Sequence, residues 1–138
     1  MNRSLAWWES LSASSPILRF VDRLLRGIGQ VMFQDNPLSG LLFFIAIGWG
    51  SWAGGAPQVA IGGLVALVAG TLTAQWLRVD AAGLNAGLYG FNAYLTGLAL
   101  ATFMAPTPQL WFYVVFGGAG SVVVFLPQIC LLFLFIGL

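Results

Sequence analysis

Two hydrophobic patterns divide the chain. From Pro16 to Gln30, apolar residues recur at helical intervals and the charged residues occupy the other face. This pattern is typical of an amphipathic helix that lies at a membrane surface. Beyond Asn36 the apolar residues are nearly continuous, which predicts helices that cross a bilayer with about 20 residues each. We therefore interpret residues 1–35 as an N-terminal interfacial segment and residues 36–138 as a transmembrane region.

Start and stop signals divide the apolar region into spans. Asn36 followed by Pro37 combines a capping residue with a first-turn proline, so the first helix should begin there. The glycine-rich loop at 54–57 should end it. The spans that we expect are about 37–53, 58–77, 81–104 and 109–138, and Pro127 with Gln128 predicts an interruption in the last of them. Residues 1–15 show no periodicity, and Trp7 and Trp8 would suit a headgroup interface.

The stretch 81–104 differs from the other spans because glycines and polar residues are distributed along it. A break near Gly90–Asn92 favours a short re-entrant helix followed by a second segment, since broken backbone at membrane depth is tolerated where it is buried or lines a wet cavity. One full span with close helix packing through small residues is the alternative. Asn85 and Asn92 fit that alternative less well, because buried amides need hydrogen-bond partners.

The distribution of arginines predicts the orientation. The amphipathic segment carries Arg19, Arg23 and Arg26, and the loop after the second span carries Arg78. Cytoplasmic loops are enriched in such residues, so we expect both segments on the cytoplasmic side and the loop at 54–57 outside. The N-terminus would then be cytoplasmic in a multi-pass protein of a cell membrane, with a bacterial inner membrane as the expected location.

Composition excludes several function classes. Hydrophobic residues make up 59% of the 138 positions and charged residues 7%, whereas soluble domains carry roughly 25% charged residues. The net charge of +1 provides no basic patch for nucleic acid. Without histidine, and with Cys130 as the single cysteine, the sequence predicts no metal, haem or other cofactor and no nucleophile–base pair for an enzyme. The function class that remains is passage of a neutral solute through the membrane. A pathway for such a solute needs hydrogen-bond partners and a matching shape rather than charge.

Gln30 and Phe33 lie where the amphipathic segment meets the first span. They could be ordinary residues near the lipid headgroups, since amides are common at interfaces. Alternatively they form a pore mouth, where the amide bonds a solute and the ring packs flat against it. Their spacing of three places them on one face of a helix.

Two long motifs resemble the urea transporter family. They are LRGIGQVMFQDNPLSGLLF, at 25–43, and AGLYGFNAYLTGLALATF, at 86–103. The first resembles the N-terminal signature of that family and the second its re-entrant helix and following span. They occur in the family's order, and the resemblance covers about 16–125.

The resemblance implies a passive channel for urea with two inverted halves, each an all-α bundle of five spans and a re-entrant half-helix. It also implies one pore in each protomer of a homotrimer. Gln30 and Phe33 would match residues at one mouth of the pore, where aromatic rings sandwich urea. Leu84 and Leu88 would match its hydrophobic wall. The partners implied are urea, the lipid bilayer and further copies of the chain.

The sequence also departs from the family pattern. The TLPF-like motif of the fifth span is missing, and no second half follows the final CLLFLFIGL. We therefore expect an incomplete half of a transporter, whether as a fragment, a frameshifted product or a half-size form that pairs. The alternative function is a non-conducting small membrane protein or accessory subunit held together by glycine-rich helix packing.

Overall fold

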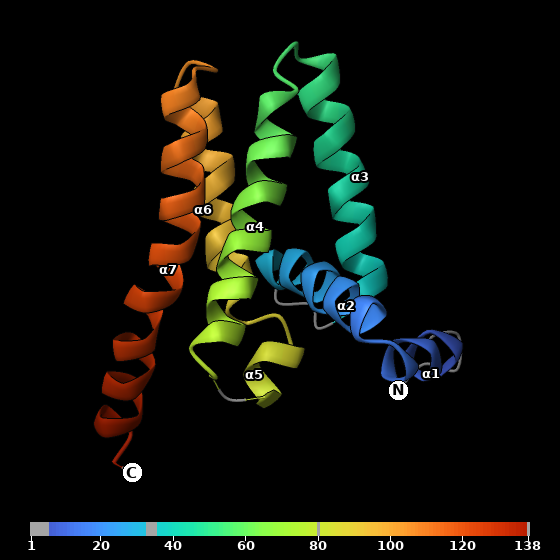
Figure 1. Cartoon of the computed structure of the whole chain (residues 1–138), viewed down its shortest axis with the longest axis vertical. Helices are drawn as coiled ribbons and strands as arrows, with labels where there is room; N and C mark the ends of the chain where they lie inside the picture. Colours follow the sequence, from blue (N-terminus) through green and yellow to red (C-terminus); the bar gives the residue numbers. More distant parts are fainter. Residues whose placement is uncertain (1–5, 33–35, 80, 138) are drawn as a thin grey trace.

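The computed structural model describes residues 6–32, 36–79 and 81–137, and within these ranges it contains helices and no strand. The elements are α1 (Ala6–Ser14), α2 (Pro16–Gly29), the 3-10 turn η2 (Gln30–Met32), α3 (Pro37–Ala53), α4 (Gln58–Trp76), α5 (Ala81–Asn85), α6 (Gly90–Phe103) and α7 (Pro108–Phe135) (Figure 1). The predicted all-α architecture is confirmed.

The start of α3 follows from its first two residues. The side-chain oxygen Oδ1 of Asn36 accepts a hydrogen bond of 2.9 Å from the backbone N–H of Leu38, and Pro37 occupies the first helical position. The helix ends at Ala53, and Gly55 then turns the chain with a φ of +73°, a left-handed conformation that glycine adopts without strain. Both predicted boundaries of this helix are confirmed.

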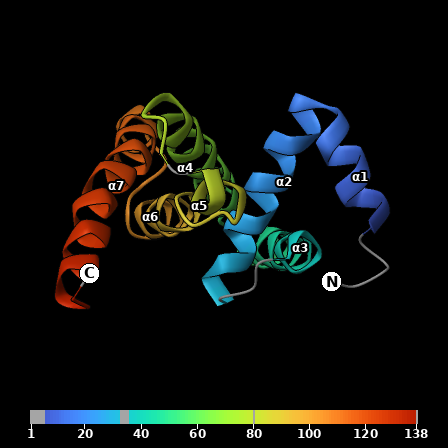
Figure 2. The same cartoon turned by 90° about the horizontal axis from the view of Figure 1, so that it is seen from below.

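Four helices form the body of the molecule. α3, α4, α6 and α7 run side by side, each antiparallel to the one before it (Figure 1). α2 crosses them near one end, and the combined axis of α2 and η2 is bent by 76° from that of α3. Seen from below, α4, α6 and α7 cluster together, while α3 lies against α2 (Figure 2). Small residues permit this close packing, because Gly62 faces Gly97 and Ala101 on α6, and Gly118 faces Ala66 on α4.

The connections divide between the two ends of the bundle. The α3–α4 and α6–α7 connections lie at one end, whereas α1, α5 and the C-terminal end of α7 lie at the other (Figure 1). Within the described ranges, α4 and the Pro108–Phe125 part of α7 are long and apolar enough to cross a membrane, and a bent α2–α3 pair would make a third span. α3 has 17 residues and α6 has 14. The re-entrant character of 81–104 and the inverted repeat stay predictions.

Three local differences separate the structure from the sequence-based prediction. Residues Ala6–Ser14 form helix α1, although their sequence shows no helical periodicity. The break within 81–104 comes earlier than expected, because α5 ends at Asn85 and α6 already begins at Gly90. α7 continues through Pro127, so the predicted interruption there is wrong. A proline removes one backbone donor, which a helix of 28 residues can tolerate.

Candidate functional site

Gln30 lies at the point where α2 meets the turn between α5 and α6. The α-helix ends at Gly29, and Gln30 opens the 3-10 turn that follows. The residue is 9% exposed, and its amide Nε2 donates a hydrogen bond of 2.9 Å to the backbone oxygen of Ala86. The amide of Gln30 therefore joins two segments that are 56 positions apart in the sequence.

Glycines allow the two segments to approach this closely. Gly87 has a φ of +81°, and a methyl group built on it would lie 2.5 Å from the carbonyl carbon of Arg26. Gly27 lies on α2, and a methyl group built on it would lie 3.1 Å from the Leu67 side chain. Gly90 also packs against Leu67. At Gly87 the methyl group would overlap backbone atoms, whereas at Gly27 and Gly90 its nearest neighbour would be the end of the Leu67 side chain.

The other predicted site residues differ in how far they are exposed. Leu84 is 8% exposed and packs in a cluster with Ala74 on α4, Tyr89 and Val122 on α7. Leu88, in the α5–α6 turn, is 36% exposed. The wall predicted for the two leucines stays a prediction. Phe33 lies outside the described residues, so its predicted position beside Gln30 stays a prediction.

A polar groove lies farther along the bundle, between α6 and α7. It has a volume of about 390 Å³, and its polar side chains are Asn92 and Thr96 from α6 and Ser121 and Gln128 from α7. The hydroxyl of Thr96 donates to the Asn92 carbonyl at 2.8 Å, and that of Ser121 donates to the Gly118 carbonyl at 2.7 Å. Both bonds run back into the residue's own helix, so the hydroxyl oxygens retain acceptor capacity.

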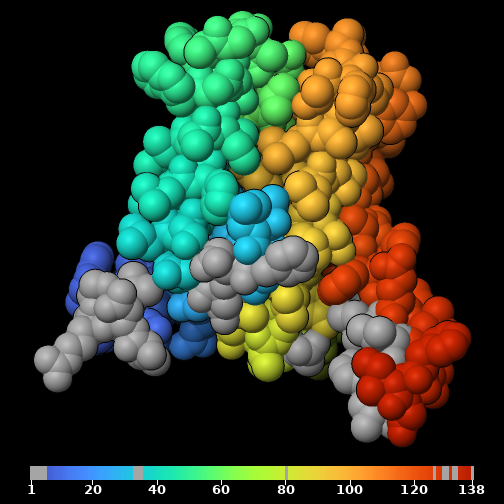
Figure 3. Space-filling model, turned by 180° about the vertical axis from the view of Figure 1, so that it is seen from behind, coloured from blue at the N-terminus to red at the C-terminus, as the bar shows by residue number. Residues whose placement is uncertain are grey.

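Sequence reasoning noted polar residues in 81–104 but predicted no groove. Asn92 and Thr96 stand out as polar residues among the glycines of 81–104. Ser121 was missed, although it and Gln128 are seven positions apart and so lie on one face of α7. Their helical spacing would have been the signal. The C-terminal end of α2, α6 and part of α7 are visible together on one face of the molecule (Figure 3).

Asn85 has a different environment from the one expected. It is exposed, and its Oδ1 accepts a hydrogen bond of 2.9 Å from Nε of Arg23. The expectation of a buried amide is therefore wrong for Asn85, because α5 lies at the end of the bundle rather than within it (Figure 1). Asn92 is half-buried. Among the described residues, no three side chains of His, Cys, Asp or Glu gather as metal ligands.

Comparison with known proteins provides the family. The model of the family described as "Urea transporter" matches residues 21–133. Urea transporter 1 of Ovis aries is 39% identical over 94 residues, which are 68% of this chain and 23% of that protein. Urea transporter 1 of Mus musculus is 38% identical over 98 residues, or 71% of this chain and 24% of that protein.

The chain thus spans about a quarter of the length of these curated relatives. The family is named for transport and not for catalysis, in agreement with the expectation that the chain is no enzyme. Its apolar helices agree with a protein of the membrane. The match over residues 21–133 shows that this chain belongs to the urea transporter family.

Proposed function

We propose that the chain supplies one wall of a passive pathway for urea across a membrane. Two relatives in which the match covers two thirds or more of this chain are both named urea transporter 1. In this proposal the chain corresponds to one half of an inverted-repeat channel. Facing protein completes the pathway, and three protomers assemble. The chain alone would then conduct little urea.

The polar groove between α6 and α7 is the observation that carries the proposal. Urea is neutral and planar, and it must exchange its hydrogen bonds with water for bonds with the protein. An unpaired polar group costs roughly 1–3 kcal/mol in a protein interior. The amides of Asn92 and Gln128 and the hydroxyls of Thr96 and Ser121 offer such bonds along the groove. No Asp, Glu, Lys or Arg occurs in 36–77 or 81–138, so the spans contain no fixed charge that would favour an ion.

The predicted mouth residues have distinct roles in this proposal. Gln30 holds the α5–α6 turn through the Ala86 carbonyl, and that turn presents Leu88 at the surface. Leu84 supports the turn from within the bundle. Phe33 provides the aromatic surface at the mouth. Substrate contact is thus proposed for Leu88 and Phe33, and positioning for Gln30 and Leu84.

The proposed orientation rests on the ends of the bundle. α2, with its three arginines, lies at the end opposite the α3–α4 connection (Figure 1). α4 ends on the same side as α2, and Arg78 follows it. With arginines favouring the cytoplasm, we place the N-terminus there and the loop at 54–57 outside, in the inner membrane of a bacterium.

A second candidate function is a non-conducting membrane subunit. The observation that favours it is the packing of α4 against α6 and α7 through Gly62, Gly97 and Gly118, which suffices to hold the helices together. In that case the groove would be dry and would face lipid or a neighbouring helix.

Thiol accessibility distinguishes the two candidates. The test uses a chimaera in which residues 21–133, with Cys130→Ala, replace the corresponding segment of Ovis aries urea transporter 1 without other reactive cysteines. Ser121→Cys places a thiol in the groove, and Val123→Cys places one two residues away, where Val123 is 54% exposed outside the groove. Methanethiosulfonate reagents react with the thiolate, which forms in water. We expect Ser121→Cys to react at least tenfold faster, whereas equally slow reaction at both positions would support the non-conducting subunit.

A further inference from the structure

The three arginines of α2 have different partners. Arg26 is paired with carboxylates, because its Nε lies 2.9 Å from Asp22 and one of its terminal nitrogens lies 3.9 Å from Glu9. The same Asp22 also accepts a bond of 2.8 Å from the indole N–H of Trp8. The positive charge of Arg26 is thus compensated within the structure.

Arg19 and Arg23 are bound to neutral oxygens instead. Arg19 donates to the Ala13 carbonyl at 3.1 Å, and Arg23 donates to Oδ1 of Asn85 at 2.9 Å. Among the described residues, neither forms an ion pair. Burial, and next the positive charge of Arg19, lower the pKa of Arg23 from its ordinary value, while the negative charge of Asp22 acts in the opposite direction. Guanidinium groups carry a positive charge in folded proteins.

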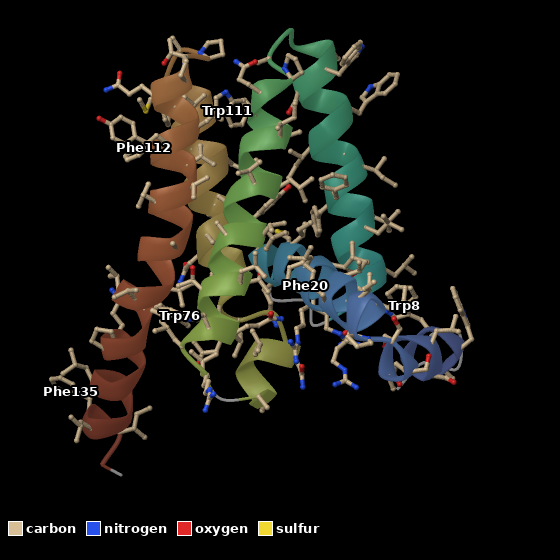
Figure 4. All side chains as sticks on the ribbon, in the orientation of Figure 1. Trp8, Phe20, Trp76, Trp111, Phe112 and Phe135 are labelled. Carbon is tan, nitrogen blue, oxygen red and sulfur yellow. The ribbon has the colours of Figure 1, made fainter. Side chains whose placement is uncertain are left out.

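A cavity of about 600 Å³ lies beside these two arginines. Arg19 and Arg23 line it together with Ile17, Phe20, Gln75 and Leu84, and the described residues that line it include no carboxylate. Phe20 is on α2, and α5 lies alongside the same helix (Figures 2 and 4). The cavity therefore combines two positive charges and an amide with an apolar wall.

We propose that this cavity binds the phosphate of an anionic phospholipid. The guanidiniums of Arg19 and Arg23 hold the phosphate oxygens, since guanidinium groups match phosphate in geometry and charge. Ile17, whose side chain is 75% exposed, and Phe20 pack against the glycerol and the first carbons of the acyl chains. A free phosphate ion would leave this apolar wall in water, so the structure favours a lipid.

Comparison with a neighbouring cavity explains why we place the lipid site on one side of α2 and not on the other. That cavity, of about 430 Å³, is lined by Arg19 and Arg26 but also by Asp22. Among its described lining residues one carboxylate partly offsets the two arginines, so an anion gains less there. The cavity lined by Arg19 and Arg23 thus has more net positive charge among its described lining residues.

Lipid binding to the purified 138-residue chain tests the proposal. In a neutral detergent, native mass spectrometry would compare phosphatidylglycerol with phosphatidylcholine of the same acyl chains. We expect phosphatidylglycerol to bind more tightly, and Arg23→Gln or Arg19→Gln to reduce that preference about fivefold, the usual effect of one arginine near anionic lipid. Arg78→Gln is the matched control, because it removes the same charge from a residue outside the cavity. Equal binding of both lipids, or an equal loss in Arg78→Gln, would overturn the proposal.

Two further measurements distinguish an effect of charge from an effect on folding, and lipid binding from binding of a free phosphate ion. Asn85→Ala removes the partner of Arg23 without changing charge, so the preference should persist. If it is lost as in Arg23→Gln, the arginine acts by holding α5 and the lipid site is refuted. Millimolar inorganic phosphate should displace phosphatidylglycerol only weakly. Complete displacement would assign the site to a free anion instead.

Discussion

Gly87→Ala should separate α2 from the α5–α6 turn. The φ of +81° at Gly87 is a left-handed conformation, in which an alanine costs about 1–2 kcal/mol. The added methyl group would also lie 2.5 Å from the carbonyl carbon of Arg26 and 2.7 Å from the Cα of Gly27. These are backbone atoms, so rotation of a side chain cannot relieve the overlap. Such overpacking typically costs a further 1–3 kcal/mol.

Gly55→Ala provides a matched control for the conformational part. Gly55 has a φ of +73°, but a methyl group there would meet nothing within 4 Å. The free energy of unfolding, measured by denaturing-detergent titration with tryptophan fluorescence, should fall by about 1–2 kcal/mol in Gly55→Ala. In Gly87→Ala it should fall by about 2–5 kcal/mol, the sum of strain and overlap.

The difference between the two variants isolates the contact between α2 and the turn. Equal losses in Gly87→Ala and Gly55→Ala would refute the reasoning, because they would mean that no backbone lies against Gly87. The close approach that positions Gln30 beside Ala86 would then be absent as well.

Two further predictions concern single hydrogen-bonding side chains. Gln30→Leu removes the donor to the Ala86 carbonyl and should lower the free energy of unfolding by about 1–3 kcal/mol. An unchanged free energy of unfolding in the same titration would show that this hydrogen bond contributes nothing to stability. The hydroxyl of Thr71 is buried and has no hydrogen-bond partner among the described residues, so Thr71→Val should be neutral or stabilising by about 1 kcal/mol. Thr73→Val, which removes a hydroxyl bonded to the Ala69 carbonyl at 2.7 Å, serves as the comparison, and a larger loss in Thr71→Val would contradict this assignment.

Local signals in the sequence predicted the elements that local interactions form. The start of α3 depends on Asn36 and Pro37, which are adjacent, and its cap was predicted. α2 was recognisable because its apolar and charged residues alternate with helical period. The family resemblance likewise depended on contiguous motifs, and the family model confirms it.

Features that depend on distant residues could not be predicted in this way. α1 packs on α2 through the bond between Trp8 and Asp22, and no periodicity within 1–15 indicates that contact. The partner of Gln30 is a backbone oxygen 56 positions away, and that of Arg23 is a side chain 62 positions away. The polar groove combines residues from two helices, so it becomes visible only when α6 and α7 are placed side by side.

Urea flux through the chimaera is the most direct test of the proposed wall. Residues 21–133 of this chain, the range matched by the family model, replace the corresponding segment of Ovis aries urea transporter 1. Stopped-flow light scattering then compares proteoliposomes of the chimaera with those of the intact sheep protein and with empty vesicles. The account predicts urea flux well above that of empty vesicles. Flux equal to that of empty vesicles, from a chimaera reconstituted in the same amount and assembled like the sheep protein, would contradict it.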